Sequence, residues 1–218
     1  DNLNGAISII YKDFNKSESQ SSKVEIIVVG GEETILYKEP DNPHIDLIHI
    51  PFDETVKEGW ITKKKNLIAQ NAKYNNLVIS HDYITIDSRL SNWFDGFKQF
   101  GEDWDVAMNR IDNLDYRRFR DWMWAEGTMV DKTNFQGHVG YLSYNITNQT
   151  DKMYISGGYF CAKKQFLLNN PLDEELCWGQ SEDLEWSLRV RNKWNYKFNP
   201  YSYARCLKYK YHYPYPID

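Results

Sequence analysis

The stretch that decides the fold is residues 155–191, which read ISGGYFCAKKQFLLNNPLDEELCWGQSEDLEWSLRVR. A glycine pair, Gly157 and Gly158, precedes a short aromatic run at 159–161, and this order predicts a turn that leads into a strand. Because glycine has no Cβ atom, the backbone of such a turn can approach a ligand closely. The turn is therefore a candidate ligand-facing segment.

An acidic pair opens the second half of this stretch. Ser181 followed by Glu182 and Asp183 predicts the first turn of a helix, because serine is a favoured N-cap and acids in a first turn interact well with the helix dipole. Capping is the commonest role of such acids. Here the pair follows Trp178 closely, and an indole offers an apolar face to a sugar ring, while a carboxylate can accept a hydroxyl proton. The combination indicates a site that handles carbohydrate.

Length and composition are those of one globular α/β domain. The 218 residues are 41% hydrophobic, which is enough for a sizeable core, and we expect a single domain over 1–218. The net charge of −5 argues against a nucleic-acid-binding protein. Aromatic residues make up 16% of the chain, which suits both sugar stacking and an ordinary aromatic core.

The cysteines and the hydropathy pattern bear on location. Cys161, Cys177 and Cys206 include no CxxC pair, so we expect free thiols in a reducing compartment. No apolar run is long enough to predict a transmembrane segment. The predicted location is the cytoplasm, including a peripheral position on a membrane. Because the chain begins at Asp1 without a methionine, a domain excised from a longer protein is also considered.

Near-continuous apolar runs predict buried strands, and amphipathic spacing predicts helices between them. Strands are expected at 5–11, 23–29, 46–51, 76–87, 103–110, 153–160 and 195–200. Helices are expected at 59–75, 88–100 and from 182 onward, while 12–23 is expected to be a loop. This order predicts a mixed, mostly parallel central sheet flanked by helices.

Two segments between these elements carry unusual composition. Residues 112–127 are dense in Arg, Asp and Trp, which is typical of a structural ion-pair cluster and also of a wall facing an acceptor. Residues 127–150 predict a long irregular excursion or a hairpin, and such long segments are often functional lids.

The motif GGYF at 157–160 with WGQSEDLE at 178–185 resembles the acceptor-side motif of nucleotide-sugar glycosyltransferases with the GT-A fold, family 2-like. The resemblance implies a single Rossmann-like GT-A domain. Residues 1–110 would then bind the nucleotide sugar and residues 111–218 the acceptor. It also implies a donor that is UDP- or GDP-linked and a glycan or glycoconjugate acceptor, as in polysaccharide biosynthesis.

On the donor side, the resemblance places the nucleotide at the ends of the first two strands. Tyr11 and Gly30 stand at these ends, and Gly30 begins a Gly-Gly pair where the family usually carries acids. The family also has a basic or amide side chain near the diphosphate, and Lys65 with Asn66 stands at that place in the run that begins at Lys63. By itself, a lysine run more often forms a solvated face.

The metal motif of the family is of the DxD type, and this chain has His81-Asp82-Tyr83 at that position. Carboxylate oxygen suits Mg²⁺ or Mn²⁺, and Mn²⁺ also accepts imidazole. Taken alone, the triplet equally indicates a turn that ends a strand. The resemblance favours the metal, with Asp82 and His81 near the diphosphate and His212 completing the metal shell.

For the reaction, the resemblance implies inversion with Asp183 as the general base and Glu182 on an acceptor hydroxyl. Gly157, Gly158 and Trp178 would line the sugar site. In a retaining enzyme, Asp183 would bind or stabilise the sugar instead.

Three other functions compete with transfer. A non-catalytic sugar-binding module would explain the aromatic content. A glycosidase needs two carboxyls on opposite sides of the scissile bond, whereas Glu182 and Asp183 are adjacent on one helical turn. A nucleotidyltransferase usually has a glycine-rich basic loop after its first strand, and residues 11–20 (YKDFNKSESQ) are not of that type.

Overall fold

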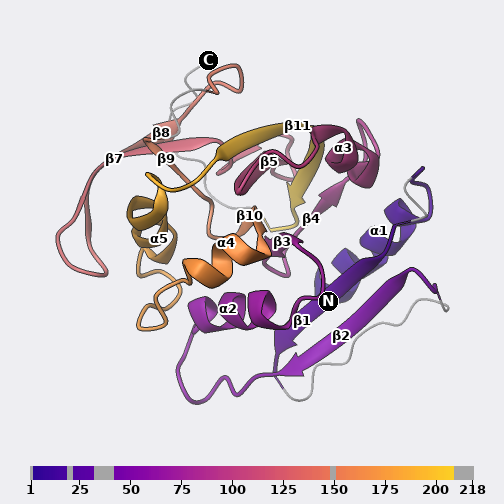
Figure 1. Ribbon diagram of the computed structural model, residues 1–218, viewed down its shortest axis with the longest axis horizontal. Helices are drawn as coiled ribbons and strands as arrows, with labels where there is room; N and C mark the ends of the chain where they lie inside the picture. Colours follow the sequence, from indigo (N-terminus) through magenta and orange to yellow (C-terminus); the bar gives the residue numbers. More distant parts are fainter. Residues whose placement is uncertain (1, 19–21, 32–41, 148–150, 209–218) are drawn as a thin grey trace.

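The computed structural model describes residues 2–18, 22–31, 42–147 and 151–208 (Figure 1). Its helices are α1 (Asn2–Phe14), α2 (Ile61–Asn71), α3 (Trp93–Phe100), α4 (Lys164–Asn169) and α5 (Glu182–Val190). Its strands are β1 (Val24–Gly30), β2 (Ile45–Pro51), β3 (Asn76–Ser80), β4 (Ile84–Asp87), β5 (Val106–Asp112), β6 (Arg118–Phe119), β7 (Met123–Met129), β8 (Phe135–Tyr141), β9 (Met153–Tyr154), β10 (Tyr159–Lys163) and β11 (Tyr196–Cys206). The mixed α/β class is as predicted.

A six-stranded sheet forms the centre of the molecule. Its order is β3-β10-β5-β11-β4, with β6 paired to the end of β5. Within this sheet, β5 and β11 pair in parallel, whereas the other described pairings are antiparallel. The prediction of a mostly parallel central sheet is therefore wrong. A continuous apolar run reports burial on both faces of a strand and does not report strand direction.

Two smaller sheets flank this one. β1 and β2 form a parallel pair with seven residues in register. β8, β7 and β9 form an antiparallel sheet in which β7 and β8 make a hairpin. The part of the predicted excursion up to Tyr141 is therefore a hairpin, and residues 148–150 of it lie outside the described residues. In Figure 1, β1 and β2 lie on one side of the molecule, away from β5 and β11.

The apolar run at 5–11 is part of α1, so the strand expected there is wrong. The buried positions of α1 include Ala6, Ile7, Tyr11 and Phe14, which recur at helical spacing. They pack against β1 and β2. A seven-residue apolar window cannot distinguish a buried strand from a helix, because the helical period appears only when Phe14 is included.

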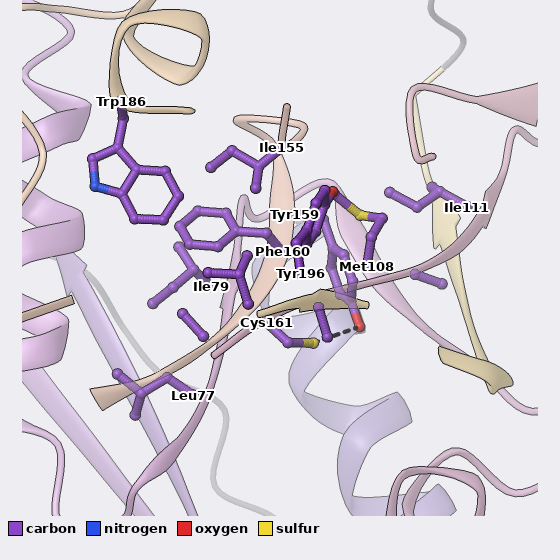
Figure 2. Close-up of a cluster of buried hydrophobic side chains, with 14 of the residues drawn as sticks. Leu77, Ile79, Met108, Ile111, Ile155, Tyr159, Phe160, Cys161, Trp186 and Tyr196 are labelled. Carbon is purple, nitrogen blue, oxygen red and sulfur yellow. Dashed lines mark hydrogen bonds between the residues drawn. The ribbon is translucent and has the colours of Figure 1, made fainter. Parts of the chain in front are cut away.

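The main core is built on the side chains of β5 and β10, the neighbouring strands at the centre of the sheet. Met108, Phe160 and Cys161 are fully buried (Figure 2), and so is Val106. The Trp186 ring of α5 packs on Phe160 with ring centroids 5.8 Å apart, which holds the acidic helix against the central sheet.

The Arg/Asp/Trp-rich segment at 112–127 is structural in its buried part. Asp121 is fully buried and lies 2.6 Å from the Arg118 guanidinium, while its other oxygen accepts hydrogen bonds from Ile111 N and Tyr144 Oη. Burial raises the pKa of Asp121, and Arg118 opposes this rise.

Other boundaries differ from prediction in informative ways. The run at 76–87 forms two strands, β3 and β4, separated by a turn at 81–83. α3 begins after Asn92, whose side-chain oxygen accepts hydrogen bonds from Phe94 N and Asp95 N.

The cysteines at 161, 177 and 206 are free thiols. Among the described residues, no helix combines the length and the apolar character needed to cross a membrane.

Candidate active site

The turn at Gly157 and Gly158 joins three separate elements. Gly157 N donates to Asp183 Oδ2 at 3.0 Å, at the start of α5. Gly157 O accepts from Lys65 Nζ of α2 at 2.7 Å. Gly158 O accepts from His81 N, just after β3, at 2.9 Å. The turn thus brings the acidic helix, the lysine helix and the His-Asp-Tyr segment to one place.

Glycine is required at position 157 by the carboxylates that surround it. A Cβ atom there would lie 3.0 Å from Glu182 Oε1 and 3.1 Å from Asp183 Oδ2. Both distances are tighter than ordinary van der Waals contact. The absence of a side chain therefore allows both acids to close on the turn.

Glu182 and Lys65 form a buried pair beneath the turn. Their side chains are 6% and 2% exposed, and Lys65 Nζ lies 3.8 Å from Glu182 Oε1. Burial raises the pKa of Glu182, the neighbouring Asp183 adds to the rise, and Lys65 opposes it. Burial lowers the pKa of Lys65, and the two carboxylates oppose that shift. Each charged side chain offsets part of the free-energy cost of burying the other.

Asp183 is more accessible than Glu182. It is half-buried, and its Oδ1 accepts a hydrogen bond from Leu184 N at 2.9 Å. Ser187, one helical turn later, accepts from Ile155 N through Oγ and donates to Asp183 O. These bonds fix the first turn of α5 to the segment that precedes the glycines.

The helix start differs from the predicted capping arrangement. Ser181 has a left-handed backbone, with φ of 57°, and its side chain makes no capping hydrogen bond. Its carbonyl accepts from Glu185 N at 2.9 Å, and Asp183 Oδ1 accepts from Leu184 N. The side-chain hydrogen bond in the first turn therefore comes from an acid and not from the serine.

His81, Asp82 and Tyr83 form the turn between β3 and β4. His81 Nδ1 lies 2.9 Å from Tyr83 Oη, and Asp82 is exposed. Burial, with Cys206 and Asp82 nearby, raises the pKa of Tyr83 to about 12. Among the described residues, no three His, Cys, Asp or Glu side chains gather as a metal cluster. The second predicted ligand, His212, lies outside those residues.

Three predicted site residues of the helices make contacts inside the protein. Tyr11 is 5% exposed within the apolar cluster of α1, β1 and β2, so the expectation that it ends a strand is wrong, while its position beside a nucleotide stays a prediction. Asn66 donates to Leu172 O and Glu174 Oε1 and accepts from Leu172 N, which holds the loop before α5. Lys65 is likewise buried and donates to Gly157 O, and its expected contact with a diphosphate stays a prediction.

A cavity of about 1090 Å³ opens beside the turn. Its lining includes Gly30, Lys65, His81, Asp82 and Trp178. Trp178 is 65% exposed, and its backbone N donates to Gly59 O at 2.8 Å, so its indole stands at the cavity rim on a fixed backbone.

The sequence signals for the supporting residues were weak. Tyr83 and Ser187 were not singled out, although Tyr83 belongs to the His-Asp-Tyr triplet and Ser187 stands four residues after Asp183. That spacing places Ser187 on the same helical face as Asp183. The pairing of Lys65 with the glycine turn spans 92 residues and has no local signal.

No family model and no curated protein matches this chain. Among solved structures, GalNAc-T7, crystallised with UDP, GalNAc and Mn²⁺, matches with a TM-score of 0.51 and 15% identity over 85% of this chain. The match spans 44% of that protein, which is less than half its length. The chain therefore has a GT-A-like fold.

Two further solved structures are more distant. HddC from Yersinia pseudotuberculosis has a TM-score of 0.42 at 11% identity, covering 91% of this chain and 79% of its own. The inositol-1-phosphate CTP transferase from T. maritima has a TM-score of 0.39 at 12% identity, covering 74% and 60%.

Proposed function

We propose that the chain is a glycosyltransferase that moves a sugar from a nucleotide-diphosphate sugar to a hydroxyl group of a glycan. One observation carries the proposal. Asp183, the accessible member of the acidic pair, is held by the same glycine turn whose other carbonyl binds the His-Asp-Tyr turn. On a GT-A-like fold, the glycine turn thus connects Asp183, a candidate proton acceptor, to a candidate donor site.

Asp183 acts as the general base in this proposal. Its two oxygens accept backbone hydrogen bonds, which orient the carboxylate and leave lone pairs for the acceptor hydroxyl. Glu182 is buried on Lys65 and serves to hold Asp183 and the turn in position, so the acceptor contact first expected of Glu182 passes to Asp183. This assignment corresponds to inversion at the transferred sugar.

A divalent cation, Mn²⁺ or Mg²⁺, fits the exposed Asp82 carboxylate. Such cations are often held by one or two carboxylates together with substrate phosphates, so a single acid in the turn is compatible with one. When bound, the cation supplies Lewis-acid stabilisation of the leaving diphosphate. His81 lies in the same turn, and its imidazole is oriented by Tyr83.

The donor lies, in this proposal, at the end of the cavity that Gly30, His81 and Asp82 line. We infer a UDP- or GDP-linked sugar. The exposed indole of Trp178 lines this cavity and offers an apolar face to a sugar ring.

The decisive experiment is transfer by Asp183→Asn. Removing the base should lower the turnover number about 10²- to 10⁴-fold while donor affinity, measured by calorimetry, stays unchanged. Glu185→Gln is the matched control, because Glu185 is an acid on the same helical turn that pairs with Arg189. Unchanged turnover in Asp183→Asn would remove the base, and the anomeric configuration of the product would distinguish inversion from retention.

A non-catalytic sugar-binding module is the second candidate, favoured by the exposed Trp178. Thermal shifts with UDP- and GDP-sugars, each with and without Mn²⁺, separate the two. A shift that needs both nucleotide and metal supports transfer, whereas a shift with free saccharides alone supports the module.

A further inference from the structure

The cavity beside the active site continues as a long slot between β1 and β3. Every residue from 22 to 30, which includes all of β1, lines it, and so does every residue from 74 to 84, which includes all of β3. Within the described part of the chain, β1 pairs with β2 alone and β3 with β10 alone. One edge of each strand therefore faces the slot.

The direction of the backbone groups shows that these two edges are open for pairing. In β1, Val24 N donates to His44 O and Gly30 O accepts from Phe52 N, so even-numbered residues face β2. Since peptide groups alternate in direction along a strand, those of Glu25, Ile27 and Val29 face the slot.

The same alternation holds in β3. His81 N donates to Gly158 O and Asn75 O accepts from Lys164 N, so odd-numbered residues face β10. The peptide groups of Asn76, Val78 and Ser80 therefore face the slot. No backbone partner for either set occurs among the described residues.

The composition of the slot is that of a protein interior. α1 lines it with Leu3, Ile7 and Ile10, and α2 lines it with Ile61 and Ile68. β1, with the sequence VEIIVVG, is an apolar strand, yet most of its residues are only half-buried, and Val78 of β3 is 37% exposed. Natural edge strands are usually protected by charges, bulges or covering elements, and an open apolar edge is a template for another strand.

We propose that an apolar β-strand of about five to seven residues fills this slot and joins β1 and β3 into one continuous sheet. The length follows from its neighbours, which have seven and five residues. A strand covered by helices should be a near-continuous run of Val, Ile or Leu.

The strand is supplied by the same protein, directly ahead of α1. Parallel neighbours need a crossover of a dozen or more residues, usually a helix. α1, with 13 residues, already leads into β1 and lines the slot. Its length of about 20 Å matches the span of about 23 Å for a seven-residue strand. A strand before Asn2 would complete a β-α-β unit and would add backbone beside the proposed donor site.

Amide hydrogen exchange tests this proposal, whether or not the protein is a transferase. The protein expressed from its complete reading frame is compared with residues 1–218 alone. The amides of Asn76, Val78 and Ser80 should exchange at least about 100-fold more slowly in the complete protein. Those of Leu77 and Ile79, which face β10, serve as internal controls with equal protection in both.

Three results would overturn the proposal. The first is equal exchange of the three amides in both proteins, and the second is a reading frame that adds nothing ahead of Asp1. The third is protection that rises with protein concentration, which would mean that a second copy fills the slot. As a separate check, Ile10→Asp should lower the melting temperature of the complete protein more than that of residues 1–218, and an equal decrease would also count against the strand.

Discussion

Lys65 shows how much a single residue contributes to this site. An ammonium group that is 2% exposed is stable only with partners, and Gly157 O and Glu182 provide them. The interaction couples the stability of α2 to the geometry of the acidic turn. A lysine that appeared to belong to a solvated charge run is thus a structural part of the site.

We expect Lys65→Met to lower the free energy of unfolding by about 3 to 5 kcal/mol, because Glu182 would remain buried without its cation. The double variant Lys65→Met with Glu182→Gln should regain part of this loss, since no buried charge would then lack a partner. Urea unfolding of the two variants and the wild type measures both effects. A single variant as stable as the wild type would contradict the pairing.

Glu182 should also make stability depend on pH. Its folded pKa is raised above the ordinary value of 4.5, so the fold favours the protonated acid. This contribution is fully present below pH 4.5 and is lost as pH rises through the folded pKa. Glu182→Gln should therefore gain stability relative to the wild type as the pH rises above about 4.5. A constant difference over that range in urea unfolding would exclude the raised pKa.

At the scale of elements, the acidic helix and the glycine turn act as one unit. α5 is anchored to the core by Trp186 and to the turn by Asp183 and Ser187. The turn in turn holds β3 through His81 N. A small displacement of the turn would therefore move Asp183 and the His-Asp-Tyr segment together.

Gly157→Ala tests whether the two carboxylates must close on the turn for transfer to occur. The added methyl group would meet both carboxylates, so we expect transfer to fall at least about 10-fold and stability to fall by about 1 to 3 kcal/mol. Gly5→Ala, at an exposed position of α1 with nothing within 4 Å, is the control and should stabilise by about 0.5 to 1 kcal/mol. Full transfer activity in Gly157→Ala would show that the carboxylates need not close on the turn.

At the scale of the whole molecule, the chain consists of a tightly packed central sheet and a smaller unit of α1, β1 and β2. β5 and β10 are almost completely buried, whereas β1 is mostly half-buried beside the slot. Regions with less buried apolar surface open at lower free energy. In residues 1–218, we expect amides that join β1 to β2 to exchange faster than those that join β10 to β5. Equal exchange rates in hydrogen-exchange NMR would mean that the two units unfold together.

The sequence by itself determined the local elements with strong signals. The apolar runs of β1, β2, β5 and β10 and the helical spacing of α2 and α5 were predictable because each depends on residues that are close together in the chain. The α/β class follows from their order. The short run in α1 was ambiguous because one apolar window fits both periods.

Tertiary structure alone decided which of these elements meet. The mostly antiparallel central sheet, the burial of Lys65 under Gly157 and the packing of Tyr11 inside an apolar cluster all depend on contacts between distant segments. Strand direction and long-range pairing leave little trace in local sequence, because apolar burial has no direction along the chain. The assignment of Asp183 over Glu182 has the same origin. Adjacent acids look alike in sequence, and only the packing of the helix makes one of them more accessible than the other.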